Sequence, residues 1–187
     1  MKIAYAQMKI AAGRPDVNTK KILQLIDEAR AGSAGVIIFP AKAISGQMLG
    51  DIGATKSFVN ECADRRYEIR DASENIYLVL DEQEIYFSDV KVEFCGAPFS
   101  INKKIYPENF PAIQVGCVGI QNTGKTIYTF DGGSKVFNSR GEIVQRVEPF
   151  TECLNFIELE DIDNMPALEL PEISETENIY RAISYGV

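Results

Sequence analysis

Residues 36 to 51 read VIIFPAKAISGQMLGD, and this stretch decides the fold. The run from Val36 to Phe39 is continuous and apolar, as expected of a strand that is covered on both faces. Pro40 then ends the strand, and small residues follow in a turn. A short strand of this kind belongs inside a sheet with other layers on both sides.

The residues before this strand predict a strand and a helix. Lys2 to Gln7 predicts the strand, and the helix is expected to be capped by Asp16 or Asn18 and to run through Arg30. Its apolar residues recur at helical spacing, at Ile22, Leu25, Ile26 and Ala29. Strand, helix and buried strand make a βαβ start. We expect a core that contains Leu25, Ile26, Val36, Ile37, Ile38 and Phe39, with Phe130 and Val136 in a second sheet.

The residues after this strand predict one more helix and then a series of strands. A polar helix is expected at residues 54–70, with Phe58, Cys62, Arg65 and Ile69 along one stripe. From Ile76 onward the β signals are YLVL, EIYF, VKVEF, AIQVGCV, TIYTF, SKVF, EIVQRV and CLNFIEL. SKVFNSRGEIVQRV is typical of a hairpin. Residues 160–174 predict a linker, and Glu175 to Tyr185 a short final helix.

The composition is that of a soluble globular domain. Of its 187 residues, 45% are hydrophobic and 25% are charged, which lies in the ordinary range. The formal net charge of -8 argues against a nucleic-acid partner, because phosphate binding needs clustered Lys and Arg. No apolar run approaches the ~20 residues that cross a bilayer, and the start MKIAYAQMKI is neither a signal nor a transit peptide. We therefore expect a cytoplasmic protein without a membrane partner.

Cysteine and histidine usage limits the chemistry. The chain has four widely separated cysteines and no histidine, so no metal site and no other cofactor is expected. The absence of histidine also excludes Ser-His-Asp and Cys-His nucleophile pairs. A nucleophile would have to be activated by carboxylate or lysine. Buried free thiols are the expected state of Cys62, Cys95, Cys117 and Cys153.

One motif favours a different class of protein. Residues 119–126, GIQNTGKT, fit the phosphate-loop pattern G-x-x-x-x-G-K-[ST], and YLVLDE at residues 77–82 resembles the acidic strand that holds magnesium in ATPases. The motif requires a helix directly after the loop, whose N-terminal amides bind the phosphates. After Lys125 comes TIYTFDGGSKVF, which is β-branched, aromatic and interrupted by two glycines. No helix is therefore expected there, and the ATPase alternative is disfavoured.

The sequence resembles the carbon–nitrogen hydrolase (nitrilase) superfamily. FPAKAISGQMLGD is similar to the segment that carries the general base of that family. Residues 126–161, which include TFDGGSKVF, are similar to the segment that closes the amidase domain of glutamine-dependent NAD synthetases, and residues 2–40 resemble the opening of that domain. The resemblance implies an α/β protein with a nitrilase-like αββα sandwich. It would be shortened, because such an amidase domain has roughly 250 residues.

The same resemblance implies that the catalytic residues have been replaced. Ala41 stands where the family has its glutamate base, and a methyl group cannot accept a proton. Arg70 stands where the oxyanion-stabilising lysine is expected, and arginine has a different reach and geometry. Cys95 is either a relic of the nucleophile or a strand-end residue. We therefore predict that no catalytic residue is intact.

These expectations favour a non-catalytic function. Residues 1–160 are expected to form the nitrilase-like domain, and residues 161–187 a linker and helix that resemble the lead-in to a synthetase domain. The chain would act as an interaction or structural scaffold, either as a homo-oligomer or docked on a larger assembly. Two alternatives stay open. One is a remnant glutamine- or nucleotide-binding domain, and the other is a weak amidase that uses Cys95 with Glu93 or Glu82 as its base.

Overall fold

The first sheet contains the βαβ start that the sequence predicts. The computed structural model describes residues 1–80, 85–100, 107–122, 124–171 and 173–186. The strand order of this sheet is β11-β1-β2-β3, in which β1, β2 and β3 are parallel and β11 is antiparallel to β1. The elements involved are β1 (Lys2–Gln7), α1 (Pro15–Ala31), β2 (Val36–Ile38), α2 (Lys56–Ala72), β3 (Tyr77–Val79) and β11 (Cys153–Glu158).

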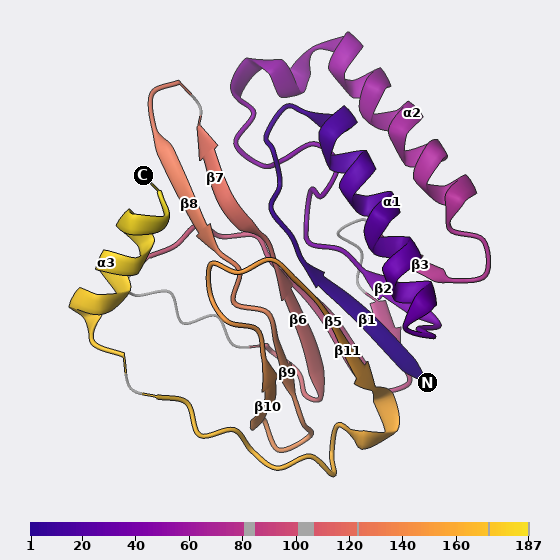
Figure 1. The fold of residues 1–187 in the computed structure, drawn as a ribbon, viewed down its shortest axis with the longest axis vertical. Helices are drawn as coiled ribbons and strands as arrows, with labels where there is room; N and C mark the ends of the chain where they lie inside the picture. Colours follow the sequence, from indigo (N-terminus) through magenta and orange to yellow (C-terminus); the bar gives the residue numbers. More distant parts are fainter. Residues whose placement is uncertain (81–84, 101–106, 123, 172, 187) are drawn as a thin grey trace.

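The second sheet has the order β10-β9-β6-β5-β4, and its β5 and β6 are parallel. Its strands are β4 (Ile85–Phe87), β5 (Val90–Cys95), β6 (Ala112–Gly116), β9 (Lys135–Phe137) and β10 (Ile143–Arg146). A separate hairpin of β7 (Val118–Asn122) and β8 (Ile127–Asp131) extends beyond the sheets, and α3 (Glu175–Tyr185) packs against β8 (Figure 1). Two 3₁₀ helices, Gly50–Ala54 and Leu159–Asp161, complete the described elements.

Two apolar clusters hold these layers together. Helices α1 and α2 lie side by side on the outer face of the first sheet (Figure 1), where Ala4 of β1 packs in one cluster with Ile26 of α1 and Ile69 of α2. The other cluster lies between the sheets and includes Tyr5 and Val115. Since successive residues of a strand point to opposite faces, β1 contributes to both clusters. The predicted layered α/β architecture is confirmed.

Two local predictions, the final helix and the buried stripe of α2, are also confirmed. The final helix has the predicted bounds, and it is capped by the Ser174 hydroxyl, which accepts a hydrogen bond from the Glu177 backbone N–H at 3.2 Å. The stripe of α2 that was predicted to face the protein consists of its least exposed residues, with Ile69 fully buried. No helix in the described ranges is both long and apolar enough to cross a membrane.

Three local predictions are wrong. Helix α1 begins at Pro15 without a side-chain cap, because proline suits the first helical position, where an N–H would stay unpaired. Phe130 belongs to β8 and packs against the cluster under the helices, not in the second sheet. The run AIQVGCV is not one strand. At Cys117 the chain leaves the second sheet, and the backbone N–H of Val118 donates to the carbonyl of Met8 at 3.0 Å.

Candidate functional site

The loop after β2, residues 40–49, meets the ends of two parallel strands of the second sheet. The carboxamide of Gln47 lies 3.5 Å from the place that a Cβ atom would take at Gly96, directly after β5. Its Nε2 also lies 4.0 Å from the Sγ of Cys117, directly after β6. The carboxyl ends of parallel strands are the usual place for ligand sites in α/β proteins. We therefore take this loop and its neighbours as the candidate site.

Hydrogen bonds from other elements hold this loop in place. The side-chain Oε1 of Gln121 in β7 accepts from the backbone N–H groups of Gln47 at 2.8 Å and Met48 at 3.1 Å. The carboxamide of Asn18, which the sequence predicted as a cap, instead donates to the carbonyl of Ile44 at 2.8 Å. Gly46 has a φ of 81°, and a Cβ there would come within 2.6 Å of a backbone atom of the loop before α1. The loop is thus fixed to both β7 and the α1 region.

The position that resembles the family base is buried and apolar. Ala41 is 3% exposed, and Ala43 and Ile44 after it belong to the cluster under the helices. Lys42, between Ala41 and Ala43, has a φ of 55°, and its side chain is exposed. Ala41 supplies neither a proton acceptor nor a charge at this position.

The other two positions singled out from the sequence lie elsewhere. Arg70 is on the exposed side of α2, beside the buried Ile69. Cys95 is the last residue of β5 and is paired with Gly116 of β6. Because Val92 and Phe94 of β5 pack in the cluster between the sheets and successive strand residues alternate, Cys95 points to the opposite face of the second sheet, away from the first sheet and the loop that follows β2. The structure does not bring these side chains together at the loop.

Glu93 and Glu82 are the two carboxylates that the sequence offers as possible bases for Cys95. Glu93 lies on the same face of β5 as Cys95, and its carboxylate is 3.3 Å from the Nζ of Lys91. The backbone N–H of Glu108 also donates to this carboxylate, at 3.4 Å. The Glu93 carboxylate is therefore engaged in an ion pair within β5 and in a backbone hydrogen bond. Glu82 lies outside the described residues.

The thiol that does reach the loop is that of Cys117, which sequence reasoning grouped with the structural cysteines. Cys117 is 1% exposed and contacts the carboxamide of Gln47. The sequence signal for the position of Cys117 is the pair Gly116–Cys117 at the end of a buried parallel strand, where the chain leaves the second sheet. Among the described residues no group of histidine, cysteine and carboxylate side chains could hold a metal ion.

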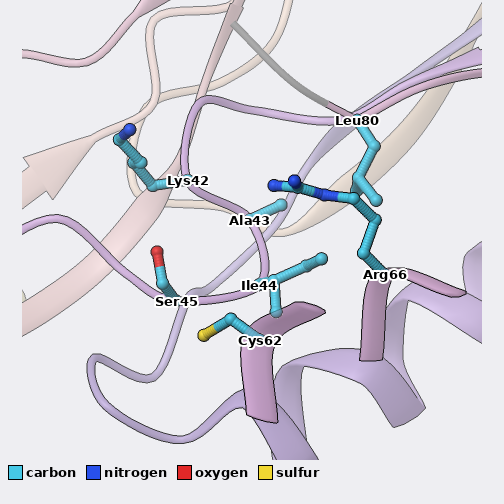
Figure 2. A pocket seen from close by; sticks show the side chains of 7 residues that line it. All are labelled: Lys42, Ala43, Ile44, Ser45, Cys62, Arg66 and Leu80. Carbon is cyan, nitrogen blue, oxygen red and sulfur yellow. The ribbon is translucent and has the colours of Figure 1, made fainter. Parts of the chain in front are cut away.

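A small cavity lies between the loop and α2. It has a volume of about 80 Å³ and is lined by Lys42, Ala43, Ile44, Ser45, Cys62, Arg66 and Leu80. Figure 2 shows that Arg66 extends its guanidinium toward the loop, whereas Lys42 points away from Arg66. Pockets for small molecules are usually about 300–1,000 Å³, and a water molecule takes about 30 Å³. The cavity has room for two or three water molecules but not for a glutamine.

The thiol in this cavity is poorly suited to nucleophilic chemistry. Burial and the neighbouring carboxylate of Glu61 raise the pKa of Cys62 above its ordinary value, and the smaller opposite effect of Arg66 does not cancel this rise. A thiol with a raised pKa is mostly protonated at neutral pH, and the thiolate is the nucleophile. The cavity beside Cys62 is therefore not a reactive-thiol site.

The segment DGGS, residues 131–134, forms a tight joint beside the site. The Oε1 of Gln7 accepts from the Ser134 backbone N–H at 3.1 Å, and its Nε2 donates to the carbonyls of Glu148 at 2.9 Å and Thr151 at 3.0 Å. A Cβ at Gly132 would come within 2.2 Å of the Gln7 side chain, and a Cβ at Gly116 within 1.9 Å of the Gly132 carbonyl oxygen. The glycines are needed because three backbone segments meet here.

The phosphate-loop lookalike is a β-hairpin, and the prediction that no helix follows Lys125 is confirmed. Asn122 of β7 pairs with Ile127 of β8, and the Asn122 side chain accepts from the Gly124 backbone N–H at 2.7 Å. Lys125 is exposed at the tip of the hairpin. A strand and not a helix follows Lys125, so the N-terminal amides that cradle phosphates in such loops are missing here.

Comparison with solved structures shows which known fold this architecture matches. The chain superposes on the glutamine-dependent NAD⁺ synthetase of Acinetobacter baumannii with a TM-score of 0.77 and 16% identity, covering 99% of this chain and 51% of that one. For NitN amidase of Nesterenkonia sp. AN1 the values are 0.59 and 13%, covering 87% of this chain and 94% of that one. The chain has a nitrilase-like fold.

Further comparisons agree with this assignment of the fold. The nitrilase-like chain also matches the glutamine-dependent NAD⁺ synthetase of Cytophaga hutchinsonii, with a TM-score of 0.62 and 12% identity over 84% of this chain and 42% of that one. It thus spans about half the length of these synthetases. No protein-family model matches its sequence, and no curated protein matches it.

Proposed function

We propose that this nitrilase-like chain is a catalytically inactive module that serves as an interaction or structural scaffold. The observation that carries the proposal is Ala41, a buried methyl group in a rigid loop at the position that resembles the family's base. Once one member of a cooperating catalytic group is gone, the others contribute little. Structures of the Nesterenkonia amidase are described with adducts on an active-site cysteine. In our chain Cys95 points away from the Ala41 loop, which further supports the absence of that chemistry.

The surface of the C-terminal segment supports a role in association. We regard residues 1–160 as the domain proper and residues 161–187 as a linker and helix that dock on it. Tyr180 is 70% exposed and Ile183 is 60% exposed on α3, and Leu168 and Leu170 are also exposed. Beside α3 lies an apolar groove of about 370 Å³, with Phe99, Tyr128 and Ile179 among its lining residues. A second copy or a larger partner would remove this apolar surface from water.

The location that suits this scaffold is the cytoplasm. None of the four cysteines, all of which lie in the described ranges, is joined in a disulfide, and Cys153 among them is exposed. Reducing conditions keep such thiols from forming disulfides.

Two measurements test the proposal. The purified chain should hydrolyse neither glutamine nor simple amides above the buffer rate, and Ala41→Glu should not restore hydrolysis. Light scattering should report a dimer or larger assembly for the wild type and a smaller species for the double variant Tyr180→Gln, Ile183→Gln. The matched control is Tyr67→Gln, which removes an equally exposed tyrosine from α2. A monomeric wild type that hydrolyses glutamine would contradict both parts of the proposal.

A further inference from the structure

We propose that a groove between β10, the stretch before α3 and α3 itself binds a free aliphatic α-amino acid. The groove shares no residue with the loop after β2, and the site goes beyond the proposed function, because it requires neither catalysis nor association. In this arrangement the guanidinium of Arg146 binds the carboxylate of the ligand, and the carboxylate of Glu169 binds its ammonium group. The apolar side chain of the ligand lies against Leu168 and Leu170.

Three separate parts of the chain line this groove. Arg146 is the last residue of β10, residues 168–171 lie in the stretch before α3, and Glu177 and Arg181 belong to α3. The groove has a volume of about 420 Å³, which lies within the range of about 300–1,000 Å³ for small-molecule sites. It is thus large enough for an amino acid, unlike the cavity beside Cys62.

The charges of the groove leave one cation and one anion without a protein partner. Arg181 pairs with Glu177 at 2.8 Å and with Glu148 at 3.4 Å, so its charge is balanced within the protein. The half-buried Arg146 and the exposed Glu169 line the same groove, but no ion pair joins them, and within the described ranges neither side chain has another hydrogen-bonding or ionic partner. Hydrogen bonds between ionised groups are the stronger ones in proteins, above all those of arginine with a carboxylate. A ligand that carries both charges can pair with both residues at once.

The apolar wall of the groove indicates the side chain of the ligand. Leu168 is 43% exposed and Leu170 is 40% exposed on this wall, to which the half-buried Ile173 also belongs. An aliphatic side chain that covers them removes apolar surface from water on both sides, whereas the polar end of glutamine would lose hydrogen bonds to water here. A fatty acid has no ammonium group for Glu169, and an amine has no carboxylate for Arg146. An aliphatic α-amino acid has all three features.

The ligand would also fasten the stretch before α3 to the second sheet. The backbone N–H of Leu168 donates to the carbonyl of Ile143 in β10 at 2.7 Å, and the stretch passes β10 on its way from β11 to α3 (Figure 1). A ligand that binds Arg146 on β10 and Glu169 on the stretch contacts both sides of this connection. Because it binds only while the stretch lies against the sheet, it makes local opening of the stretch rarer.

The test is a titration of the intact, isotope-labelled chain with L-leucine, followed by NMR. We expect saturable shifts of the Arg146 side-chain Nε–H signal and of the backbone amides of Glu169 and Leu170. Three compounds serve as controls: isocaproate lacks the ammonium group, isoamylamine lacks the carboxylate, and glutamine has a polar side chain. Each should bind at least about tenfold more weakly than leucine. Hydrogen exchange at the Leu168 amide should become slower when leucine is bound.

Two variants each remove one charge from the groove. Arg146→Gln and Glu169→Gln should each weaken leucine binding by about tenfold or more. Because neither side chain has a partner in the part of the chain that the structure describes, the melting temperature without leucine should stay the same in both variants. The matched control is Arg65→Gln, which removes an arginine of α2 outside the groove and should bind leucine like the wild type.

Several results would overturn the inference. One is the absence of a saturable shift with leucine at about 10 mM, because weaker binding is not specific recognition. Another is equal binding of isocaproate or isoamylamine, since the groove would then recognise a single charge. Unchanged leucine binding in Arg146→Gln would place the ligand elsewhere, and a lower melting temperature of this variant without leucine would show that the guanidinium already has a partner in the protein. An unchanged exchange rate at the Leu168 amide would exclude the stretch before α3 from the site.

Discussion

The joint around Gln7 gives a prediction whose size can be worked out from its contacts. Gln7→Met keeps the length of the side chain but removes three hydrogen bonds to backbone groups. The Ser134 N–H is buried, so leaving it unpaired costs about 2 kcal/mol, and the part-buried carbonyls of Glu148 and Thr151 add about 0.5–1 kcal/mol each. We expect the free energy of unfolding to fall by about 3–4 kcal/mol. That is a large part of the about 5–15 kcal/mol typical of a domain.

Urea denaturation followed by circular dichroism measures this loss. With a slope of about 2–3 kcal/mol per molar urea, the midpoint should fall by about 1–2 M without a change in slope. The matched control is Gln24→Met, which makes the same chemical change on the exposed face of α1, where glutamine and methionine have similar helix propensities. Its midpoint should move little. A loss below about 1 kcal/mol for Gln7→Met would refute the view that these hydrogen bonds hold the joint together.

The remaining predictions concern three other features of the chain. Gly116→Ala should lower the free energy of unfolding by more than about 2 kcal/mol because its Cβ would meet the Gly132 carbonyl oxygen, whereas Gly35→Ala, whose nearest atoms are 4.0 Å away, should change it by less than about 0.5 kcal/mol in the same urea assay. Mg-ATP should not raise the melting temperature, since a ligand that binds the native state would do so; a rise of several degrees that Lys125→Ala abolishes would restore the ATPase alternative. The hydrogen bond from Arg14 holds the pKa of the Asp16 carboxyl at about 2, and NMR titration should show a higher pKa in Arg14→Gln. Because this pKa lies below the unfolded value of about 3.9, the contribution of the pair to stability is present above that pH and is lost as the pH falls toward 2.

The local elements could be predicted because their signals lie within a few residues of one another. The spacing of Ile22, Leu25 and Ile26 identifies a helix with one buried face, and the final helix at Glu175–Tyr185 has its predicted bounds. The residues after Lys125 exclude a phosphate loop by their own backbone preference. Each of these inferences needs only short-range steric and hydrogen-bonding rules.

The sequence by itself determined the layered α/β architecture and the presence of Ala41 at a position that resembles the family's base. The tertiary structure decided which thiol lies beside the loop that carries Ala41. Strand alternation turns Cys95 away from that loop, and the departure of the chain from the second sheet brings Cys117 to Gln47. Both outcomes depend on the pairing of β5 with β6 and of Val118 with the segment after β1, and these contacts join residues far apart in the sequence. No local pattern encodes such a pairing, because it is selected by the packing of whole sheets.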